Sequence, residues 1–220
     1  MKNIKAIIFD AYGTLFDVNS AAEKRKDKIG DKWEAFANYW RTTQLEYTWL
    51  RSLMKRHKDF WQVTEDSLDK SMKVFNIDNS MRNELLDLYK ILSPYPEVPE
   101  ILKSLKEKDY KLSILSNGTP SLLNELVKSN NLENLFDDVF SIEEVGIYKP
   151  DSKVYDLPIK KYKIKNNEVA FLSANTWDVS GGGNYGFNSI WVNRNNSIFD
   201  NLDYRPQYEV KSLKELINVI

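Results

Sequence analysis

The sequence contains no cysteine and only one histidine. Without cysteine, disulfide bonds, thiolate catalysis and cysteine-ligated metal sites are excluded. With His57 as the only imidazole, a two-histidine metal site is excluded as well. His57 lies in the charged stretch MKRHKDF, and we expect it on a solvated helix face.

The chain also lacks an excess of charge of one sign and a long apolar run. Its 31 basic and 32 acidic residues leave a net charge of −1, so nothing indicates a surface for nucleic acid or for membrane lipid. No apolar run approaches the roughly 20 residues that span a bilayer. The first apolar stretch is too short for a secretory signal, and the residues that follow it are too acidic. We expect a cytoplasmic protein.

The order of the sequence patterns predicts the fold class. Residues 20–92 show helical periodicity with almost no strand signal, and Thr64 is expected to cap one of these helices. After three prolines in 93–100, helices alternate with short apolar strands near residues 111–115, 137–140, 168–172, 189–192 and 208–210. This alternation predicts an α/β fold, a doubly wound parallel sheet of the Rossmann-like kind, with an inserted all-helical cap. We place the core at 1–15 and 97–220, and the cap at 16–96.

Polar side chains follow the apolar strands where each of them ends. Asp10 ends the first run, IIFD, and Ser116 and Asn117 follow KLSIL. Ser173, Asn175 and Asp178 come after EVAFL, and Lys149 adds a cation in a loop. Each of these residues alone could cap a turn or a helix. In an open parallel sheet, however, ligands bind beyond the carboxyl ends of the strands, so the shared polarity predicts one site.

These residues stand in segments that resemble a known family. DAYGT at 10–14, SNG at 116–118, YKP at 148–150 and Asp178 follow the four-motif layout of the haloacid dehalogenase superfamily. FDAYGTLFDV, YWRTTQLEYTWLRSLM, LSNG, YKPDSKVY and FLSANTWD resemble the L-2-haloacid dehalogenases, also called (S)-2-haloacid dehalogenases. The resemblance spans the core and the cap, in family order.

The resemblance implies hydrolysis of short-chain L-(S)-2-haloalkanoic acids to D-(R)-2-hydroxy acids and halide. Asp10 would displace the halide and form an ester, which water would then hydrolyse. It also implies a homodimer whose small-molecule partners are the 2-haloacid and the halide, and no cofactor or metal. The resemblance also implies a role for each residue of the site. Arg41 and Asn117 would bind the halide, Ser116 would bind the substrate carboxylate, and Lys149 would neutralise charge. Asp178 would activate water with Ser173 and Asn175, Thr14 and Tyr155 would support the nucleophile and the lysine by hydrogen bonding, and Leu45, Phe60 and Trp177 would form the pocket wall.

Tyr12 separates this activity from its nearest alternative. Phosphatases of the superfamily carry a second aspartate two residues after the nucleophile, which protonates the departing alcohol. They also need Mg²⁺, because a carboxylate that attacks a phosphate dianion meets like-charge repulsion. A halide leaves as a stable anion, so Tyr12 at this position, counted among the substrate-binding residues, favours dehalogenation.

Two alternative functions stay open at this point. A Mg²⁺-dependent phosphatase would show EDTA-sensitive hydrolysis of a phosphate ester without halide release, and a non-catalytic binding module would be indifferent to substitution of Asp10. Pro158 is expected to disturb the helix just after Tyr155. Ala174 and the run Gly181–Gly183 are expected to loosen the loop on the water side of the site.

Overall fold

The computed structural model describes residues 1 and 3–220 and contains one six-stranded sheet with the strand order β3-β2-β1-β4-β5-β6. Every neighbouring pair of strands is parallel. The strands are β1 (Ala6–Phe9), β2 (Lys111–Ser116), β3 (Asp138–Ser141), β4 (Val169–Ser173), β5 (Asn188–Val192) and β6 (Tyr208–Val210). The strand order reverses between β1 and β4, so Asp10 leaves the sheet at the topological switch point.

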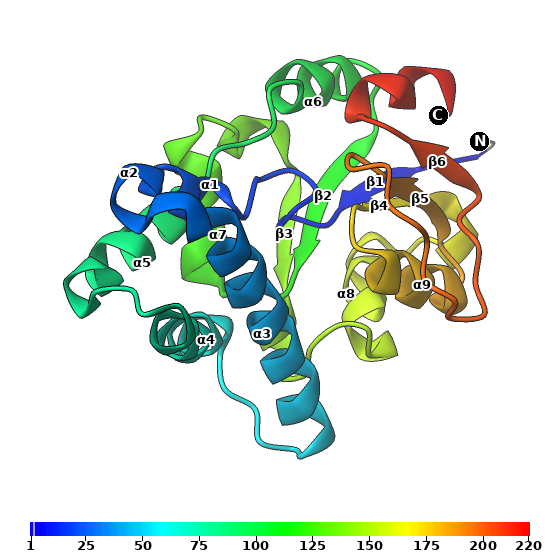
Figure 1. Ribbon diagram of the computed structural model, residues 1–220. Coiled ribbons are helices and arrows are strands. Elements are labelled where there is room, and N and C mark those ends of the chain that lie inside the picture. The colour runs from blue at the N-terminus through cyan, green and yellow to red at the C-terminus, as the bar shows by residue number, and fades with distance from the viewer. Residues whose placement is uncertain (2) are drawn as a thin grey trace.

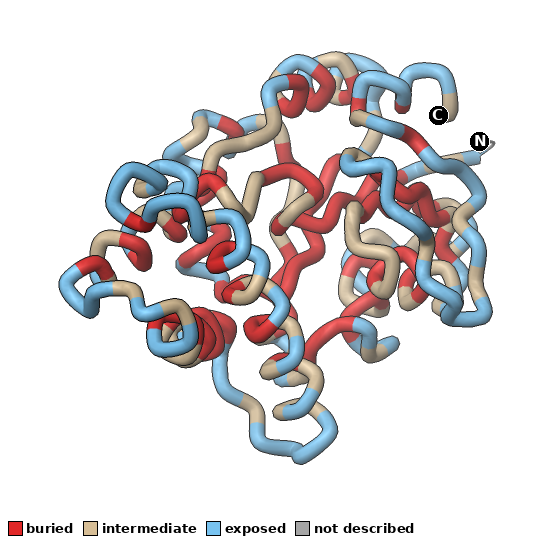
Figure 2. Tube along the Cα trace, in the orientation of Figure 1, coloured by how far each residue is buried: buried red, intermediate tan, exposed pale blue. Residues whose placement is uncertain are grey.

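All four residues of β1 and all five of β4 are buried. A strand that is covered on both faces reads as a continuous apolar run, which is why these segments could be located from the sequence. The covering helices are α6 (Val98–Lys106), α7 (Pro120–Ser129), α8 (Ser152–Tyr162) and α9 (Thr176–Tyr185). Figure 1 shows them around the sheet, and the buried trace in Figure 2 runs through the sheet between them.

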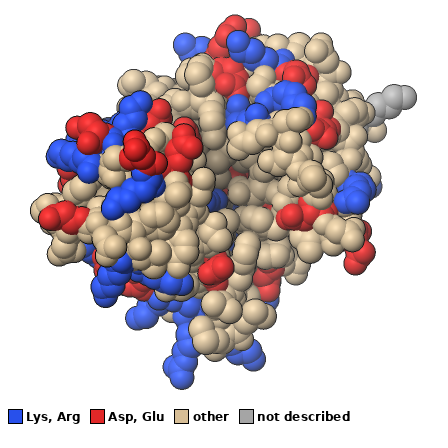
Figure 3. Space-filling view, in the orientation of Figure 1, with Lys and Arg blue, Asp and Glu red and all other residues tan. Residues whose placement is uncertain are grey.

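Five further helices lie between β1 and α6 in the chain and form a body beside the sheet (Figure 1). They are α1 (Ser20–Glu23), α2 (Lys26–Ile29), α3 (Trp33–Leu53), α4 (Phe60–Phe75) and α5 (Arg82–Lys90). The fold-class prediction, a doubly wound parallel sheet with an inserted helical unit, is therefore confirmed. The space-filling view in Figure 3 shows a groove between the two parts and charges of both signs across this face.

The two connections to the helical insert are hydrogen-bonded to each other. The Asp17 amide donates to the Ser93 carbonyl at 2.8 Å, and the Tyr95 amide donates to the Leu15 carbonyl at 3.0 Å. This pairing ties the chain that leaves β1 to the chain that returns before α6. Within residues 1 and 3–220, no helix is both long enough and apolar enough to cross a bilayer.

Two expectations about the helical insert are wrong. Asp59, not Thr64, caps α4, because its carboxylate accepts a hydrogen bond from the Gln62 amide, while Thr64 is buried inside the helix. His57 lies in the loop between α3 and α4 instead of on a helix face, and its Nε2 is 2.9 Å from Oε2 of Glu143 in the sheet part of the molecule. This contact joins the insert to the sheet part.

The expectation of a loose glycine loop is also wrong, because Gly181–Gly183 lie inside α9. A Cβ on Gly181 would stand 2.4 Å from the Tyr155 hydroxyl, and one on Gly182 would stand 2.6 Å from the Phe171 ring. The glycines therefore allow close packing of α9 against its neighbours. Pro158 likewise leaves α8 continuous, although it removes the hydrogen bond that would run to the Val154 carbonyl.

We expect Gly182→Ala to lower the free energy of unfolding by about 1–3 kcal/mol, because its Cβ would collide with the buried Phe171 ring. Gly183→Ala is the matched control. Its Cβ would come 1.9 Å from the ring of Tyr204, but that ring is only partly buried and can move. Gly183→Ala should therefore stay within about 0.5 kcal/mol of the parent. Urea unfolding measures both variants, and the opposite ranking would contradict this packing role.

Candidate active site

The centre of the site is a lysine that lies between two carboxylates. Lys149 Nζ is 3.2 Å from Oδ1 of Asp10 and 2.9 Å from Oδ2 of Asp178. The lysine and both acids are buried. Burial opposes a charged amine, but Asp178 and Asp10 together raise the pKa of Lys149 above its usual value. The lysine is therefore a permanent cation.

Burial has the opposite effect on the acid at the start of α9. It raises the pKa of Asp178 to about 6, and Asp10 adds to the increase, while Lys149 and Tyr155 counteract it. The Tyr155 hydroxyl donates to Asp178 Oδ1 at 2.7 Å. Tyr155 was expected to support the lysine, and the structure corrects this, because its hydroxyl contacts the aspartate that pairs with the lysine. At neutral pH Asp178 is mainly ionised, with both oxygens hydrogen-bonded.

The second oxygen of Asp10 accepts hydrogen bonds from neutral groups. Thr14 Oγ1 lies 3.0 Å from Asp10 Oδ2, Asn175 Nδ2 lies 2.9 Å away and Ser173 Oγ lies 3.5 Å away. Asn175 Nδ2 also donates to the Tyr12 carbonyl at 3.2 Å. Both partners of this amide can only accept, so the nitrogen must face them. The two oxygens of Asp10 therefore differ, because Oδ1 faces a cation and Oδ2 faces neutral donors.

The residues after β2 connect to this centre through the lysine loop. The side-chain oxygen of Asn117, Oδ1, accepts a hydrogen bond from the backbone amide of Lys149 at 3.1 Å. Ser116 Oγ accepts from the Gly118 amide at 3.1 Å, which shapes the turn that follows the strand. Both residues are buried at the end of β2. Asn117 thus holds Lys149 in position, while its NH₂ group remains a donor for a ligand.

The helical insert contributes a guanidinium and apolar side chains. Arg41, on α3, reaches the Tyr12 carbonyl with Nη2 at 3.5 Å, and Leu45 lies one turn further along the same face of the helix. Phe60, the first residue of α4, packs on the Tyr12 ring with a centroid separation of 5.1 Å. Burial holds the pKa of Tyr12 well above its usual value, so its phenol stays neutral.

The structure therefore brings the expected residues together to different degrees. Asp10, Thr14, Lys149, Ser173, Asn175, Asp178 and Tyr155 form one hydrogen-bonded set. The side chain of Asn117 joins this set through the backbone amide of Lys149, and the side chain of Arg41 joins it through the backbone carbonyl of Tyr12. Phe60 packs on Tyr12, and Trp177, which precedes Asp178, packs edge-on against Trp49 of α3. Ser116 and Leu45 form no hydrogen bond with this set among the described residues.

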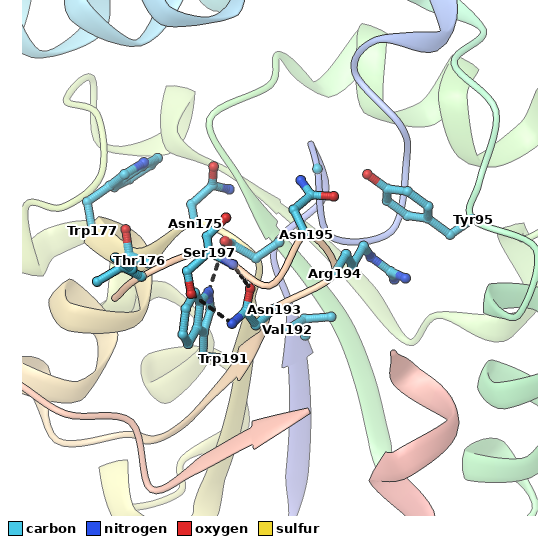
Figure 4. A pocket seen from close by; sticks show the side chains of 13 residues that line it. Tyr95, Asn175, Thr176, Trp177, Trp191, Val192, Asn193, Arg194, Asn195 and Ser197 are labelled. Carbon is cyan, nitrogen blue, oxygen red and sulfur yellow. Dashed lines mark hydrogen bonds between the residues drawn. The ribbon is translucent and has the colours of Figure 1, made fainter. Parts of the chain in front are cut away.

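A polar pocket of about 250 Å³ adjoins this set and shares Asn175 with it (Figure 4). The far wall of the pocket includes Arg194, a residue that the sequence reasoning missed. Its guanidinium lies 3.8 Å from the centre of the Tyr95 ring, and its Nη2 donates to the Thr14 carbonyl at 2.9 Å. Arg194 comes two residues after the end of β5, so the rule that located the other strand ends could also have found it.

Comparisons with known proteins agree with this geometry. The family model for haloacid dehalogenase-like hydrolases matches residues 4–186. (S)-2-haloacid dehalogenase 1 of Pseudomonas sp. (strain CBS-3) is 40% identical over 219 residues, which cover 98% of this chain and 96% of the relative. A crystal structure of a dehalogenase matches with a TM-score of 0.98 at 36% identity and covers 100% of this chain and 98% of its own. L-2-haloacid dehalogenase from Xanthobacter autotrophicus, with chloropropionic acid covalently bound, matches with a TM-score of 0.90 at 32% identity, over 98% of both chains.

We expect Lys149→Met to lower the free energy of unfolding by about 3–5 kcal/mol at neutral pH, because two buried carboxylates would lose their cation. The loss should depend on pH. The pKa of Asp178, already raised to about 6, would rise further, so the folded variant would keep a proton that the unfolded chain releases near pH 4. A raised carboxyl pKa makes stability fall as pH rises through that interval.

The difference from the parent should therefore shrink toward about pH 5 and grow toward about pH 8. Denaturant unfolding at both pH values measures it. Lys153→Met, which removes an exposed lysine near the start of α8, is the control and should change little. A loss for Lys149→Met that is equal at both pH values would contradict the charge argument.

Proposed function

The chain belongs to the haloacid dehalogenase-like hydrolase family, and we propose that it is an L-2-haloacid dehalogenase with Asp10 as its nucleophile. Its reaction is the hydrolysis of a short (S)-2-haloacid to the (R)-2-hydroxy acid and halide. The observation that carries the residue assignment is the Asp10–Lys149–Asp178 cluster, which holds one buried cation between two carboxylates.

In the first step, an oxygen of Asp10 attacks C2 of the acid, and the carbon–halogen bond breaks with its electron pair leaving on the halide. Oδ1 suits this attack, because it accepts one hydrogen bond, from Lys149, whereas Oδ2 accepts hydrogen bonds from both Thr14 and Asn175. Attack from the side opposite the halide inverts C2. The product is an ester between Asp10 and the acid.

Two side chains, the Arg41 guanidinium and the Asn117 amide, assist departure of the halide. Arg41 and the NH₂ group of Asn117 are the groups proposed to bind the anion as it leaves. The hydroxyl of Ser116 and nearby amides are proposed to bind the substrate carboxylate, while Leu45, Phe60 and Trp177 surround the carbon chain. Hydrogen bonds between these donors and an anion are stronger where the groove excludes water than they would be in open solvent.

In the second step, water attacks the carboxyl carbon of Asp10. Asp178 is the proposed base, because a carboxylate with a pKa of about 6 is ionised at neutral pH and still accepts a proton better than an ordinary aspartate. The negative charge that develops on Oδ2 meets the donors already placed there, Thr14, Ser173 and Asn175. The bond between that carbon and the ester oxygen then breaks, the departing oxygen takes up the proton that Asp178 removed from water, and the 2-hydroxy acid is released.

The reaction as proposed needs no metal ion. The two acceptors on this side of the nucleophile, Asp10 Oδ2 and the Tyr12 carbonyl, both accept from Asn175 Nδ2. A cation bound to these two atoms would have to displace that donor. The halide also needs no protonation, and the attacked carbon carries no charge that a metal would have to neutralise.

We further propose a cytoplasmic homodimer, on the family resemblance. The end of α3 supports a partner surface, because Leu50, Leu53 and Met54 are 50%, 80% and 60% exposed. Large exposed apolar side chains that stand together are typical of an interaction surface.

We expect the protein to release chloride from (S)-2-chloropropionate and not from the (R) enantiomer, and to keep this activity in EDTA. Asp10→Asn should reduce halide release at least about a thousandfold, because a neutral amide cannot displace the halide. Asp27→Asn, on an exposed surface of α2, is the matched control and should retain full activity. Chloride release and chiral analysis of the lactate measure the outcome. EDTA-sensitive hydrolysis of p-nitrophenyl phosphate without chloride release would contradict the proposal.

A further inference from the structure

We infer that Gln44 is a positioning residue for Arg41, one that aims the guanidinium at the departing halide and leaves its positive charge unneutralised. This inference rests on the proposed function, in which Arg41 binds the halide. Gln44 lies three residues after Arg41 on α3, and its side chain is buried, with the residue only 1% exposed. Arg41 Nη1 donates to Gln44 Oε1 at 2.8 Å.

Thr64 fixes which end of the Gln44 amide faces the arginine. The single proton of the Thr64 hydroxyl goes to the Phe60 carbonyl at 2.7 Å, within α4. The Thr64 oxygen can then only accept a hydrogen bond, so the Gln44 atom that lies 2.7 Å away must be the nitrogen, Nε2. Oε1 therefore points toward Arg41, and the arginine, which is only a donor, needs an acceptor there.

Tyr89 completes the arrangement from α5. Its hydroxyl accepts from Gln44 Nε2 at 3.0 Å and lies 3.3 Å from Gln44 Oε1. Three helices thus hold one buried amide, and that amide holds one side of the guanidinium. An arginine loses rotational freedom when it binds an anion, and fixing it beforehand reduces that cost.

The acceptor is neutral, and this distinguishes Arg41 from neighbouring arginines. Arg51 of α3 pairs with Asp66, and Arg82 pairs with Asp69. Among residues 1 and 3–220, the side-chain and backbone acceptors of Arg41 are the Gln44 amide and the Tyr12 carbonyl, and no carboxylate forms an ion pair with it. A carboxylate in place of Gln44 would orient the guanidinium equally well, but it would cancel the charge that binds the halide.

Two substitutions at Gln44 separate orientation from charge. Gln44→Glu keeps an acceptor and adds a negative charge, and Gln44→Met keeps the size and removes the acceptor. Gln207→Glu, on an exposed position before β6, is the matched control for the change in net charge. Three quantities are measured in each protein at constant ionic strength. The first is the inhibition constant of sodium bromide. The other two are the rate of ester formation on Asp10 and the rate of ester hydrolysis, from quenched single turnovers of (S)-2-chloropropionate analysed by mass spectrometry.

We expect both Gln44 variants to weaken bromide inhibition and to slow ester formation by about tenfold or more, the loss of roughly one charge-assisted hydrogen bond. Hydrolysis of the ester should stay within about twofold, because the halide has already left at that stage. A general packing defect would slow both steps together. Unchanged bromide inhibition and unchanged ester formation in folded Gln44 variants would overturn the inference.

Thr64→Val keeps the test decisive if a Gln44 variant fails to fold. It leaves Gln44 in place and removes the hydroxyl that accepts from the Gln44 amide and donates to the Phe60 carbonyl, so bromide inhibition should weaken by about threefold or more. Wild-type bromide inhibition in Thr64→Val would then overturn the inference. Failure of the proposed function is recognised separately, because the parent protein would then form no ester on Asp10.

Discussion

The structure depends on the buried ion contacts of Lys149, whose Nζ lies 3.2 Å from Asp10 and 2.9 Å from Asp178. Two carboxylates could not share this buried position without the lysine, since their like charges would repel each other strongly where little water screens them. With the lysine between them, Asp10 and Asp178 can take the roles proposed for them, nucleophile in the first step and base in the second. The strand order explains half of this meeting, because it places Asp10 at the switch point and β4, which leads to Asp178, beside β1. The Lys149 loop follows β3, two strands away, and Asn117 after β2 holds it toward the site.

The helical insert has a different task from the sheet part. The sheet part supplies charged and polar groups that end strands, while the insert supplies apolar side chains and the guanidinium of Arg41, which forms no ion pair among residues 1 and 3–220. Neutral partners surround that arginine, whereas other arginines of the insert are used in ion pairs such as Arg51–Asp66. The charge of Arg41 therefore remains available for a ligand. The proposed displacement of halide needs this division, because negative charge would move from Asp10 toward the insert during the reaction.

Much of the fold could be predicted from the sequence, because buried parallel strands read as unbroken apolar runs and their polar ends stand out. The misses at Thr64 and Gly182 share one cause, which is that tertiary contacts cannot be seen in a local pattern. Thr64 resembles a helix cap until α3 is packed against α4, and only then does its hydroxyl prove to orient Gln44. Gly182 resembles part of a mobile loop until the ring of Phe171 is placed against it. Arg194 was overlooked for a different reason, since the strand-end rule was not applied to β5.

The central claim is that Asp10 becomes covalently attached to the substrate and is regenerated by water. A single turnover of (S)-2-chloropropionate in ¹⁸O-labelled water, with enzyme in excess, tests it most directly. Mass spectrometry of the peptide that contains Asp10 should find the heavy isotope in its carboxylate, while the hydroxyl of the first lactate released should carry the ordinary isotope. Label in that first lactate, with none in the Asp10 peptide, would mean that water attacks the substrate carbon directly, and the account would be wrong.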